Sequence, residues 1–272
     1  MIRERSWILL GEMIEIRDYR DPESLTLASV CTLNYEKGYE LAGMVRRRWL
    51  KWMMRRGLSG LVAYEGKTPV GFFEFIPIEE APDRIQGKDL IYIICGMVHL
   101  WDRPERKRYT GRGIGRMLIE RIERVAKRRA KGVVAWGYDW DSWYMPAGFF
   151  RHLGYEEVDR EGKRVLLLKR FKRVEPPRFI RKDFEFTPIK GKVVIDIFSS
   201  EQCPFFISLV SKWQQVVKGM GKRYFIRIHQ LRTNRDFIKF GRGMSILING
   251  RPIPLGPMSS ERIKEILLKE GR

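Results

Sequence analysis

The segment Tyr109-Thr-Gly-Arg-Gly-Ile-Gly-Arg-Met-Leu118 combines three glycines with arginines, a composition that suits binding of a pyrophosphate. Glycines leave backbone N–H groups exposed where the chain turns into a helix, and helix N-termini attract anions. Arginine can also fork onto phosphate oxygens. A glycine-rich turn that merely opens a basic surface helix fits the segment alone equally well. The basic residues around it are Arg106, Lys107, Arg108, Arg112 and Arg116.

Two well-known phosphate loops do not match this segment. A dinucleotide-binding fold places its glycines after an early strand, with an acidic residue about 20 positions further on. Here several predicted strands precede the glycines. A P-loop requires Gly-Lys followed by Ser or Thr, and no such triplet occurs in the segment. The order of elements around the loop therefore carries more information than the glycines.

Hydrophobic patterning around the loop predicts a mixed sheet with helices packed on it. The Pro176-Pro177 pair then interrupts regular structure, since proline fits neither a helix interior nor a central strand. We expect a domain over 1–172, a linker over 173–186 and a second domain over 187–272. In the first domain, helices are predicted at 36–56, 114–129 and 147–153, and strands at 61–64, 69–76, 90–98, 132–138 and 164–169.

The second domain reads as a small sheet with helices on both faces. A tight turn at Asn249-Gly250 joins its last two strands, and Ser259 offers an N-cap for the final helix. Predicted strands are 193–198, 224–229, 244–248 and 252–255, and predicted helices are 204–219 and 259–270, with a short helix or a turn at 234–240.

The chain carries a formal net charge of +20, and residues 187–272 supply half of it with 16 Lys plus Arg against 6 Asp plus Glu. Such a surface is typical of RNA or other polyanion binding. The abundance of charge also fits a thermophile-type protein. No apolar run reaches the roughly 18 residues of a membrane span, which predicts a soluble, cytoplasmic protein without a membrane partner. Three widely spaced cysteines predict no disulfide and no metal site.

The chain resembles the GNAT acetyltransferase superfamily over roughly residues 24–171. That family's loop reads Gln/Arg-x-x-Gly-x-Gly/Ala, and the register here is Thr110-Gly-Arg-Gly-Ile-Gly115, with Thr110 in place of the usual first residue. The family's closing segment, often Phe-Tyr-Glu-Lys-Leu-Gly-Phe, reads Phe149-Phe-Arg-His-Leu-Gly-Tyr155. The resemblance implies an α/β fold in which a mixed GNAT sheet is flanked by helices.

Acetyl-coenzyme A is the cofactor that this resemblance implies. The strand that ends at Met97-Val98 is expected to splay from its neighbour, so that its backbone holds the pantetheine arm and polarises the thioester carbonyl. The residues implied to bind the cofactor are Met97, Val98, Arg108, Thr110, Gly111, Arg112, Gly113, Ile114, Gly115, Arg116 and Phe150.

The reaction implied is direct attack of an amine, of unknown identity, on the thioester. The predicted catalytic residues are Glu74, Tyr144 and Cys95. Glu74 lies in an apolar strand, where burial would make a carboxylate a stronger base, although a solvent-facing position on an alternating strand fits equally. Phe150 stands where many relatives have a proton-donating tyrosine, which leaves Tyr144, His152 and Tyr155 as donors. Other base candidates are Tyr92, Asp139 and Asp141.

The whole chain resembles a narrower group, GNAT proteins with a C-terminal YoaP-like domain. The residues behind this are Glu74-Phe-Ile-Pro-Ile-Glu79, Cys95, and Ser200-Glu-Gln-Cys-Pro-Phe205. The resemblance implies a smaller, thioredoxin-like α/β second domain. Cys203 precedes a predicted helix, whose dipole would stabilise a thiolate, but the second cysteine of Cys-x-x-Cys is missing.

Two alternatives to acetyl transfer stay open at this level. One is a basic binding module in which a degenerate GNAT scaffold recognises RNA or a protein. The other is a monothiol redox protein acting through Cys203.

Overall fold

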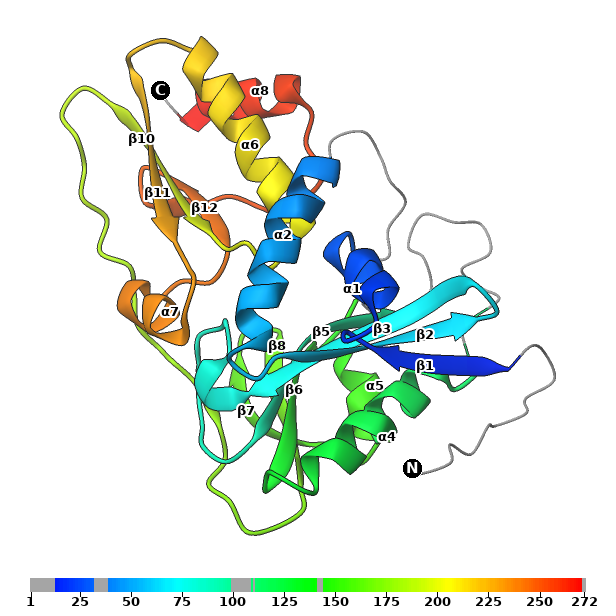
Figure 1. Cartoon of the computed structure of the whole chain (residues 1–272). Coiled ribbons are helices and arrows are strands. Elements are labelled where there is room, and N and C mark those ends of the chain that lie inside the picture. The colour runs from blue at the N-terminus through cyan, green and yellow to red at the C-terminus, as the bar shows by residue number, and fades with distance from the viewer. Residues whose placement is uncertain (1–12, 32–38, 99–108, 110, 141–143, 271–272) are drawn as a thin grey trace. The chain divides into compact units, whose positions relative to one another are not determined.

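The computed structural model describes residues 13–31, 39–98, 109, 111–140 and 144–270 (Figure 1). They form two compact units. The first comprises the described residues within 1–36, 47–81 and 85–179, and the second those within 37–46, 82–84 and 180–272. In the described part of the chain, no helix is long and apolar enough to cross a membrane.

A seven-stranded sheet in the order β1-β2-β3-β5-β6-β8-β7 organises the first unit. Every neighbouring pair is antiparallel except β5 and β6, which run parallel. The predicted mixed sheet is therefore confirmed. The strands are β1 (Ile14–Asp18), β2 (Ser59–Glu65), β3 (Thr68–Pro77), β5 (Ile91–Val98), β6 (Gly132–Tyr138), β7 (Glu156–Glu161) and β8 (Arg164–Arg170).

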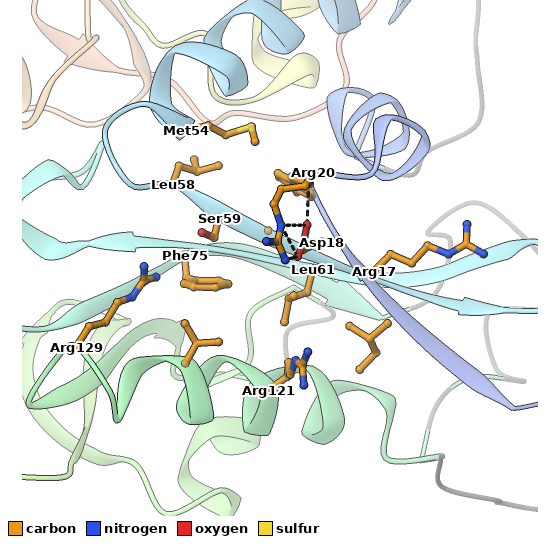
Figure 2. A pocket seen from close by; sticks show the side chains of 14 residues that line it. Arg17, Asp18, Arg20, Met54, Leu58, Ser59, Leu61, Phe75, Arg121 and Arg129 are labelled. Carbon is orange, nitrogen blue, oxygen red and sulfur yellow. Dashed lines mark hydrogen bonds and ion pairs between the residues drawn. The ribbon is translucent and has the colours of Figure 1, made fainter. Parts of the chain in front are cut away.

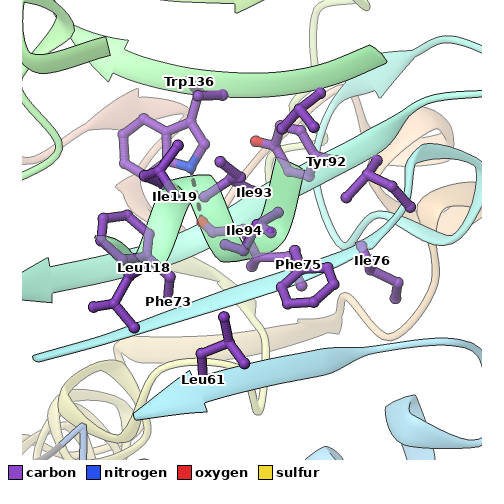
Figure 3. Close-up of a cluster of buried hydrophobic side chains, with 14 of the residues drawn as sticks. Leu61, Phe73, Phe75, Ile76, Tyr92, Ile93, Ile94, Leu118, Ile119 and Trp136 are labelled. Atoms are coloured by element: carbon purple, nitrogen blue, oxygen red, sulfur yellow. Dashed lines mark hydrogen bonds between the residues drawn. The ribbon is translucent and has the colours of Figure 1, made fainter. Parts of the chain in front are cut away.

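Helix α4 (Ile114–Ala126) is amphipathic, and its helically spaced apolar residues enter the core. Its Leu118 and Ile119 share one buried cluster with Phe73, Phe75 and Ile94 of the sheet (Figure 3). The helix ends three residues before its predicted end, because the amides of 128 and 129 bond to carbonyls three residues back. The other helices are α1 (Pro22–Ser29), α2 (Tyr39–Met54), α5 (Ala147–His152) and the 3-10 turn η1 (Ile78–Glu80).

Several elements escaped sequence prediction because they are short or highly charged. Strand β7, which pairs with β8, reads Glu-Glu-Val-Asp-Arg-Glu. Because it has a single apolar residue, its sequence shows no hydrophobic alternation. Strand β1 has five residues, and α1 begins at an Asp21 cap followed by Pro22, with few apolar positions behind it. Two short strands, β4 (Ile85–Gln86) and β9 (Arg178–Phe179), pair with each other, and β9 lies inside the segment predicted as a linker.

The second unit contains a four-stranded sheet in the order β11-β10-β12-β13. Only β10 and β11 are parallel. Helices cover both faces as predicted: α6 and α8 pack on Ile195 and Ile197, whereas Phe237 of α7 packs with Phe198 and Leu247. The elements are β10 (Val193–Ser199), β11 (Tyr224–Gln230), β12 (Ser245–Ile248), β13 (Arg251–Pro252), α6 (Pro204–Gly219), α7 (Asn234–Phe240) and α8 (Ser260–Glu270).

A buried ion cluster lies in the centre of this second sheet. The carboxylate of Asp196 has no solvent exposure, and it accepts bonds from Arg227 Nε at 2.7 Å and His229 Nε2 at 2.7 Å. The ring of His229 stacks on Phe198 with centroids 4.5 Å apart. Burial opposes the charge of Asp196, but the bonds from His229 and Arg227 outweigh it and lower the pKa of Asp196 below its usual range.

We expect Asp196→Asn to reduce the free energy of unfolding of the second unit by about 2 kcal/mol, because it leaves the Arg227 charge without its buried counter-ion. A carboxyl with a depressed pKa stabilises the fold above its unfolded pKa, and this contribution is lost as the pH falls through the folded pKa. Denaturant unfolding at pH 7 and at stepwise lower pH measures both effects. The gap between wild type and variant should narrow below about pH 4. The exposed Asp183→Asn is the control, and equal stability of both variants at pH 7 would contradict the expectation.

Candidate active site

Strands β5 and β6 are paired at one end and separate at the other. Their ladder covers Ile91 to Ile93 opposite Val133 to Ala135 and then stops, although β5 continues to Val98. On its other edge β5 remains paired with β3 as far as Val98. Within the described residues, Ile94–Val98 therefore has no partner strand on the β6 side, which is the arrangement in which a ligand can pair with a strand edge.

A bulge and an indole fix this separation. The register between β3 and β5 shifts after Glu74, so that Ile94 is the extra residue of β5. The indole Nε1–H of Trp136, on β6, donates to the carbonyl of Ile94 at 2.8 Å (Figure 3). Trp136 is buried, and its ring occupies the point where the ladder ends. The side chain thus replaces the missing backbone pairing and holds the two strands apart.

The glycine loop leads into α4 with its backbone open. Gly111 and Gly113 have φ of 77° and 74°, and a Cβ on either would meet nothing within 4 Å. Gly113 is the N-cap of α4, so the free N–H groups of the first helical turn follow it directly. At Gly115 a Cβ would lie 3.1 Å from the Phe149 ring and 3.3 Å from Val98 Cγ2. The missing side chain at Gly115 therefore lets the helix start approach the end of β5.

The charged residues of the loop occupy different environments. Arg112 Nη1 forms an ion pair with the buried Glu65 at 2.7 Å, and its guanidinium lies 5.8 Å above the Tyr109 ring. Arg116 is exposed on the first turn of α4. The predicted ligands Arg108 and Thr110, together with Arg106 and Lys107, lie outside the described residues. The ion pair to Glu65 anchors the loop, a role that the sequence did not reveal.

The three predicted catalytic residues lie near one another, two of them on paired strands and Tyr144 in the segment after β6. Glu74 stands opposite Cys95, so the two side chains project from the same face. Glu74 is fully buried and accepts a hydrogen bond from Tyr19 Oη at 2.7 Å. The sulfur of Cys95 lies 3.1 Å from the hydroxyl of Tyr144. The burial of Glu74 excludes the solvent-facing alternative that the alternating strand left open.

Tyr19 was missed because it follows a short, unpredicted strand. Its ring covers Gly60, where a Cβ would come within 2.1 Å of the ring. Gly60 stands opposite Glu74 in the β2–β3 ladder, so this glycine creates the space through which Tyr19 reaches the carboxylate. A glycine inside a strand is a known sign of such a close approach, and that signal was present in the sequence.

The other candidates near the closing segment lie in different environments. Asp139 forms ion pairs with Arg151 and Arg160, and the bond from Arg151, followed by that from Arg160, lowers the pKa of this carboxyl. Burial raises the pKa of Tyr155 well above its usual value of 10.0. Phe150 is fully buried in the core. His152 is exposed, with a ring nitrogen 2.7 Å from the carbonyl of Gly148.

An aromatic cluster borders the gap between β5 and β6. Trp136 contacts Tyr138 and Tyr144 with ring centroids 5.4 and 5.7 Å away, and Tyr138 lies 4.2 Å from Trp140. Trp140 is 44% exposed, whereas Trp136 is buried. The cluster thus extends from the buried core at Trp136 to the protein surface at Trp140. Asp141 and Trp143 lie outside the described residues.

Cys203 is the N-cap of α6 in the second unit, directly after β10 and before Pro204, as predicted. It is half-buried and not in a disulfide. Among the described residues no three His, Cys, Asp or Glu side chains are grouped so that they could hold a metal ion.

The close packing at Gly96 provides a test of this scaffold. A Cβ at Gly96 would lie 2.0 Å from the Phe73 ring, so we expect Gly96→Ala to displace that ring and cost about 2 kcal/mol or more of unfolding free energy. Gly148→Ala in α5 meets nothing within 4 Å and should be neutral or stabilising by up to about 1 kcal/mol. Thermal unfolding measures the melting temperature of both variants, and we expect a lower value for Gly96→Ala. Equal melting temperatures would refute the packing described at Gly96.

Residues 27–155 match the family model of the acetyltransferase (GNAT) family. The curated protein "Uncharacterized N-acetyltransferase YoaP" of Bacillus subtilis (strain 168) is 23% identical over 245 residues, which is 88% of this chain and 92% of that protein.

Solved structures show more distant similarity. A GNAT family acetyltransferase from Brucella melitensis, in complex with acetyl-CoA, is 18% identical with a TM-score of 0.38, over 60% of this chain and 91% of that one. The PaiA N-acetyltransferase from Thermoplasma acidophilum, in complex with coenzyme A, is 18% identical with a TM-score of 0.37, over 58% of this chain and 99% of that one. Residues 27–155 are thus similar to the acetyltransferases of the GNAT family, and the similarity to the curated N-acetyltransferase extends over most of the chain.

Proposed function

We propose that the protein transfers an acetyl group from acetyl-coenzyme A to an amine by direct attack on the thioester. The observation that carries this proposal is the separation of β5 from β6 beside the glycine-capped start of α4. A strand edge without a partner strand and a helix N-terminus lie together, and they suit the two polar ends of the same extended ligand.

The residues present fit that donor. A pyrophosphate needs close approach to backbone N–H groups, and the open space in front of Gly111 and Gly113 permits it. The amide-rich pantetheine arm can pair with the β6-side edge of β5 at Met97 and Val98, as an additional strand would. Gly115 brings these two surfaces together by allowing contact with Val98.

The chain's own groups can assist the reaction in three ways. Backbone N–H groups of Ile94–Val98 can stabilise the oxyanion that forms when an amine attacks the carbonyl. Tyr144 can protonate the departing thiolate, because its hydroxyl lies beside Cys95 on the same strand edge. We assign Glu74 as the base for the amine proton, reached through water, with Tyr19 positioning its carboxylate. Cys95 contacts Tyr144 and is assigned to its orientation.

We further propose that residues 187–272, which make up most of the second unit, form a thioredoxin-like domain that docks the acceptor. Support comes from its element order, β-α-β-α-β-β-α, and from a sheet in which the first strand lies between the second and third. The position of Cys203 at the start of the first helix also fits. Dithiol exchange is not proposed, because Phe206 stands where a second cysteine would be needed. The positive charge of this domain favours an acidic acceptor molecule.

The loop is tested with a pair of alanine variants that carry similar backbone strain. Gly113→Ala and Gly162→Ala both place a side chain at positive φ, 74° and 59°, with nothing within 4 Å. We expect only Gly113→Ala to weaken acetyl-CoA binding, by about tenfold, since its methyl group occupies the anion cradle. Calorimetric titration measures the affinities. Equal affinity for both variants, or no binding by the wild type at millimolar concentrations, would contradict the proposal.

The role of Tyr144 is tested by Tyr144→Phe. We expect kcat to fall about 100-fold with KM for acetyl-CoA nearly unchanged, because only the proton donor is removed. Acetyl-CoA turnover is followed with an acceptor identified by product mass from a panel of amines. The control is Tyr138→Phe, since Tyr138 also contacts Trp136 but is not bonded to Cys95. A variant with unchanged kcat would assign the proton transfer elsewhere.

A further inference from the structure

Strand β11 forms one edge of the second sheet, and among the described residues only β10 pairs with it. At the end of this parallel ladder the Leu231 amide donates to the Ser199 carbonyl at 2.8 Å. Alternate residues of a strand bond to the same neighbour, so the odd-numbered residues of β11 face β10. The N–H and C=O groups of Ile226 and Ile228 therefore point away from the sheet, and no hydrogen bond reaches them from the described part of the chain.

The segment that precedes β10 lies over the face of this sheet. The ring of Phe186 lies 5.6 Å from the guanidinium of Arg227, on β11. A Cβ on Gly250 would come within 2.9 Å of Phe186 Cβ, and Gly250 lies next to β13, at the opposite edge of the sheet. Because Phe186 contacts residues of both edges, this segment crosses the sheet and does not follow the edge of β11.

The other edges of the two larger sheets carry features that prevent strand addition. β13 has two residues, one of them Pro252, and five of the six residues of β7 are charged. Three of the five residues of β1 are charged, and two of these, Arg17 and Asp18, line a cavity of about 510 Å³ (Figure 2). Short, charged or proline-containing edges are the usual protection against pairing with another chain. β11 has seven residues in unbroken register without proline, and its arginine, Arg227, is paired with Asp196.

The start of β11 is basic. Lys190, Lys192 and Lys222 are exposed, and Lys192 Nζ donates to the carbonyl of Lys222 at 2.6 Å, which joins the turns before β10 and before β11. No Asp or Glu occurs in 186–195 or in 202–226, the stretches that meet here. In the described part of the chain none of the three lysines forms an ion pair. Positive charge at this end of the edge is therefore available to an acidic partner.

We propose that the edge of β11 binds an extended acidic segment of another protein, which adds to the sheet as a further strand. Its backbone pairs with Ile226 and Ile228, and its carboxylates lie beside the lysines at the start of β11. An apolar side chain of the segment covers Phe225, which is 44% exposed. RNA would use the lysines but not the strand edge. A second copy of the chain would repel this surface, because residues 187–272 contain 16 Lys plus Arg against 6 Asp plus Glu.

This mode of binding specifies the docking role proposed above for the second domain. Its consequence for acetyl transfer rests on that proposed function, whereas the binding itself requires no acetyl donor. The two are therefore tested separately.

The test measures fluorescence anisotropy of the labelled peptide Glu-Asp-Glu-Val-Thr-Val-Thr-Val with the full-length chain at low salt. Two matched peptides serve as controls. In one, lysine replaces each acidic residue, and in the other the backbone amides of the Val-Thr part are N-methylated and can no longer donate hydrogen bonds. We expect the acidic peptide to bind at least tenfold more tightly than either control.

Variants of the chain separate charge from backbone pairing. Lys190→Gln combined with Lys222→Gln should weaken binding of the acidic peptide about tenfold. Lys264→Gln combined with Lys269→Gln removes the same charge from exposed positions of α8 and should bind as the wild type does. Ile228→Pro removes an outward N–H, and we expect it to bind about tenfold more weakly than Ile228→Ala, which also loses the isoleucine side chain.

Equal affinities for the acidic and N-methylated peptides would exclude the strand edge, and equal affinities for the acidic and lysine peptides would exclude an acidic partner. Tighter binding of a uridine oligonucleotide, lost in the Lys190→Gln, Lys222→Gln variant, would assign the surface to RNA. A dimer in sedimentation that dissociates in Ile228→Pro would assign the edge to a second copy. If Ile228→Pro does not fold, the peptide pair still decides. Acetyl-CoA turnover that persists while the acidic peptide fails to bind would overturn this proposal alone.

Discussion

The hydrogen bond from the Trp136 indole to the Ile94 carbonyl is the interaction on which the candidate active site depends. A parallel pair of strands would normally continue its ladder to the shorter strand's end. Here the ladder stops after Ile93 and Ala135, and a buried side chain satisfies the carbonyl that the ladder would have used. The cost of an unpaired buried backbone group is thereby avoided at Ile94, while the described part of β5 continues to Val98 without a partner strand on that side.

The end of the β5–β6 ladder lies beside side chains that project from both faces of the sheet. Phe73 and Phe75 project toward the cluster that contains α4, so the helix start is fixed relative to the open strand edge. Glu74, between them, projects from the opposite face, together with its cross-strand neighbour Cys95. The bulge at Ile94 shifts the register of this edge, and Gly60 admits the Tyr19 ring beside it. The residues that we propose for cofactor binding and for proton transfer are therefore organised by the same three strands, β2, β3 and β5.

Sequence reasoning located the elements that follow strong hydrophobic periods. β6 and α6 begin and end as predicted, α7 occupies the segment for which a short helix or a turn was expected, and the glycine loop precedes a helix that starts at Ile114. It missed β1 because this strand has only five residues, and β7 because this strand has a single apolar residue. Tyr19 was missed with β1, which it follows directly. The contact between Tyr19 and Glu74 joins residues 55 positions apart. Only the fold brings such residues together, so the spacing of residue types could not have shown it.

Charge was the least informative property at the level of sequence, for a physical reason. A net charge of +20 suggests a polyanion partner, yet many arginines are engaged within the protein: Arg112 with Glu65, Arg227 with Asp196, and Arg151 with Asp139. Each of these pairs organises a turn or a strand rather than a binding surface. Attraction for an anion depends on where positive charge exceeds its local carboxylates and also adjoins surface that a ligand can desolvate. The ion pairs that each arginine makes in the fold therefore say more about its role than the net charge of the chain does.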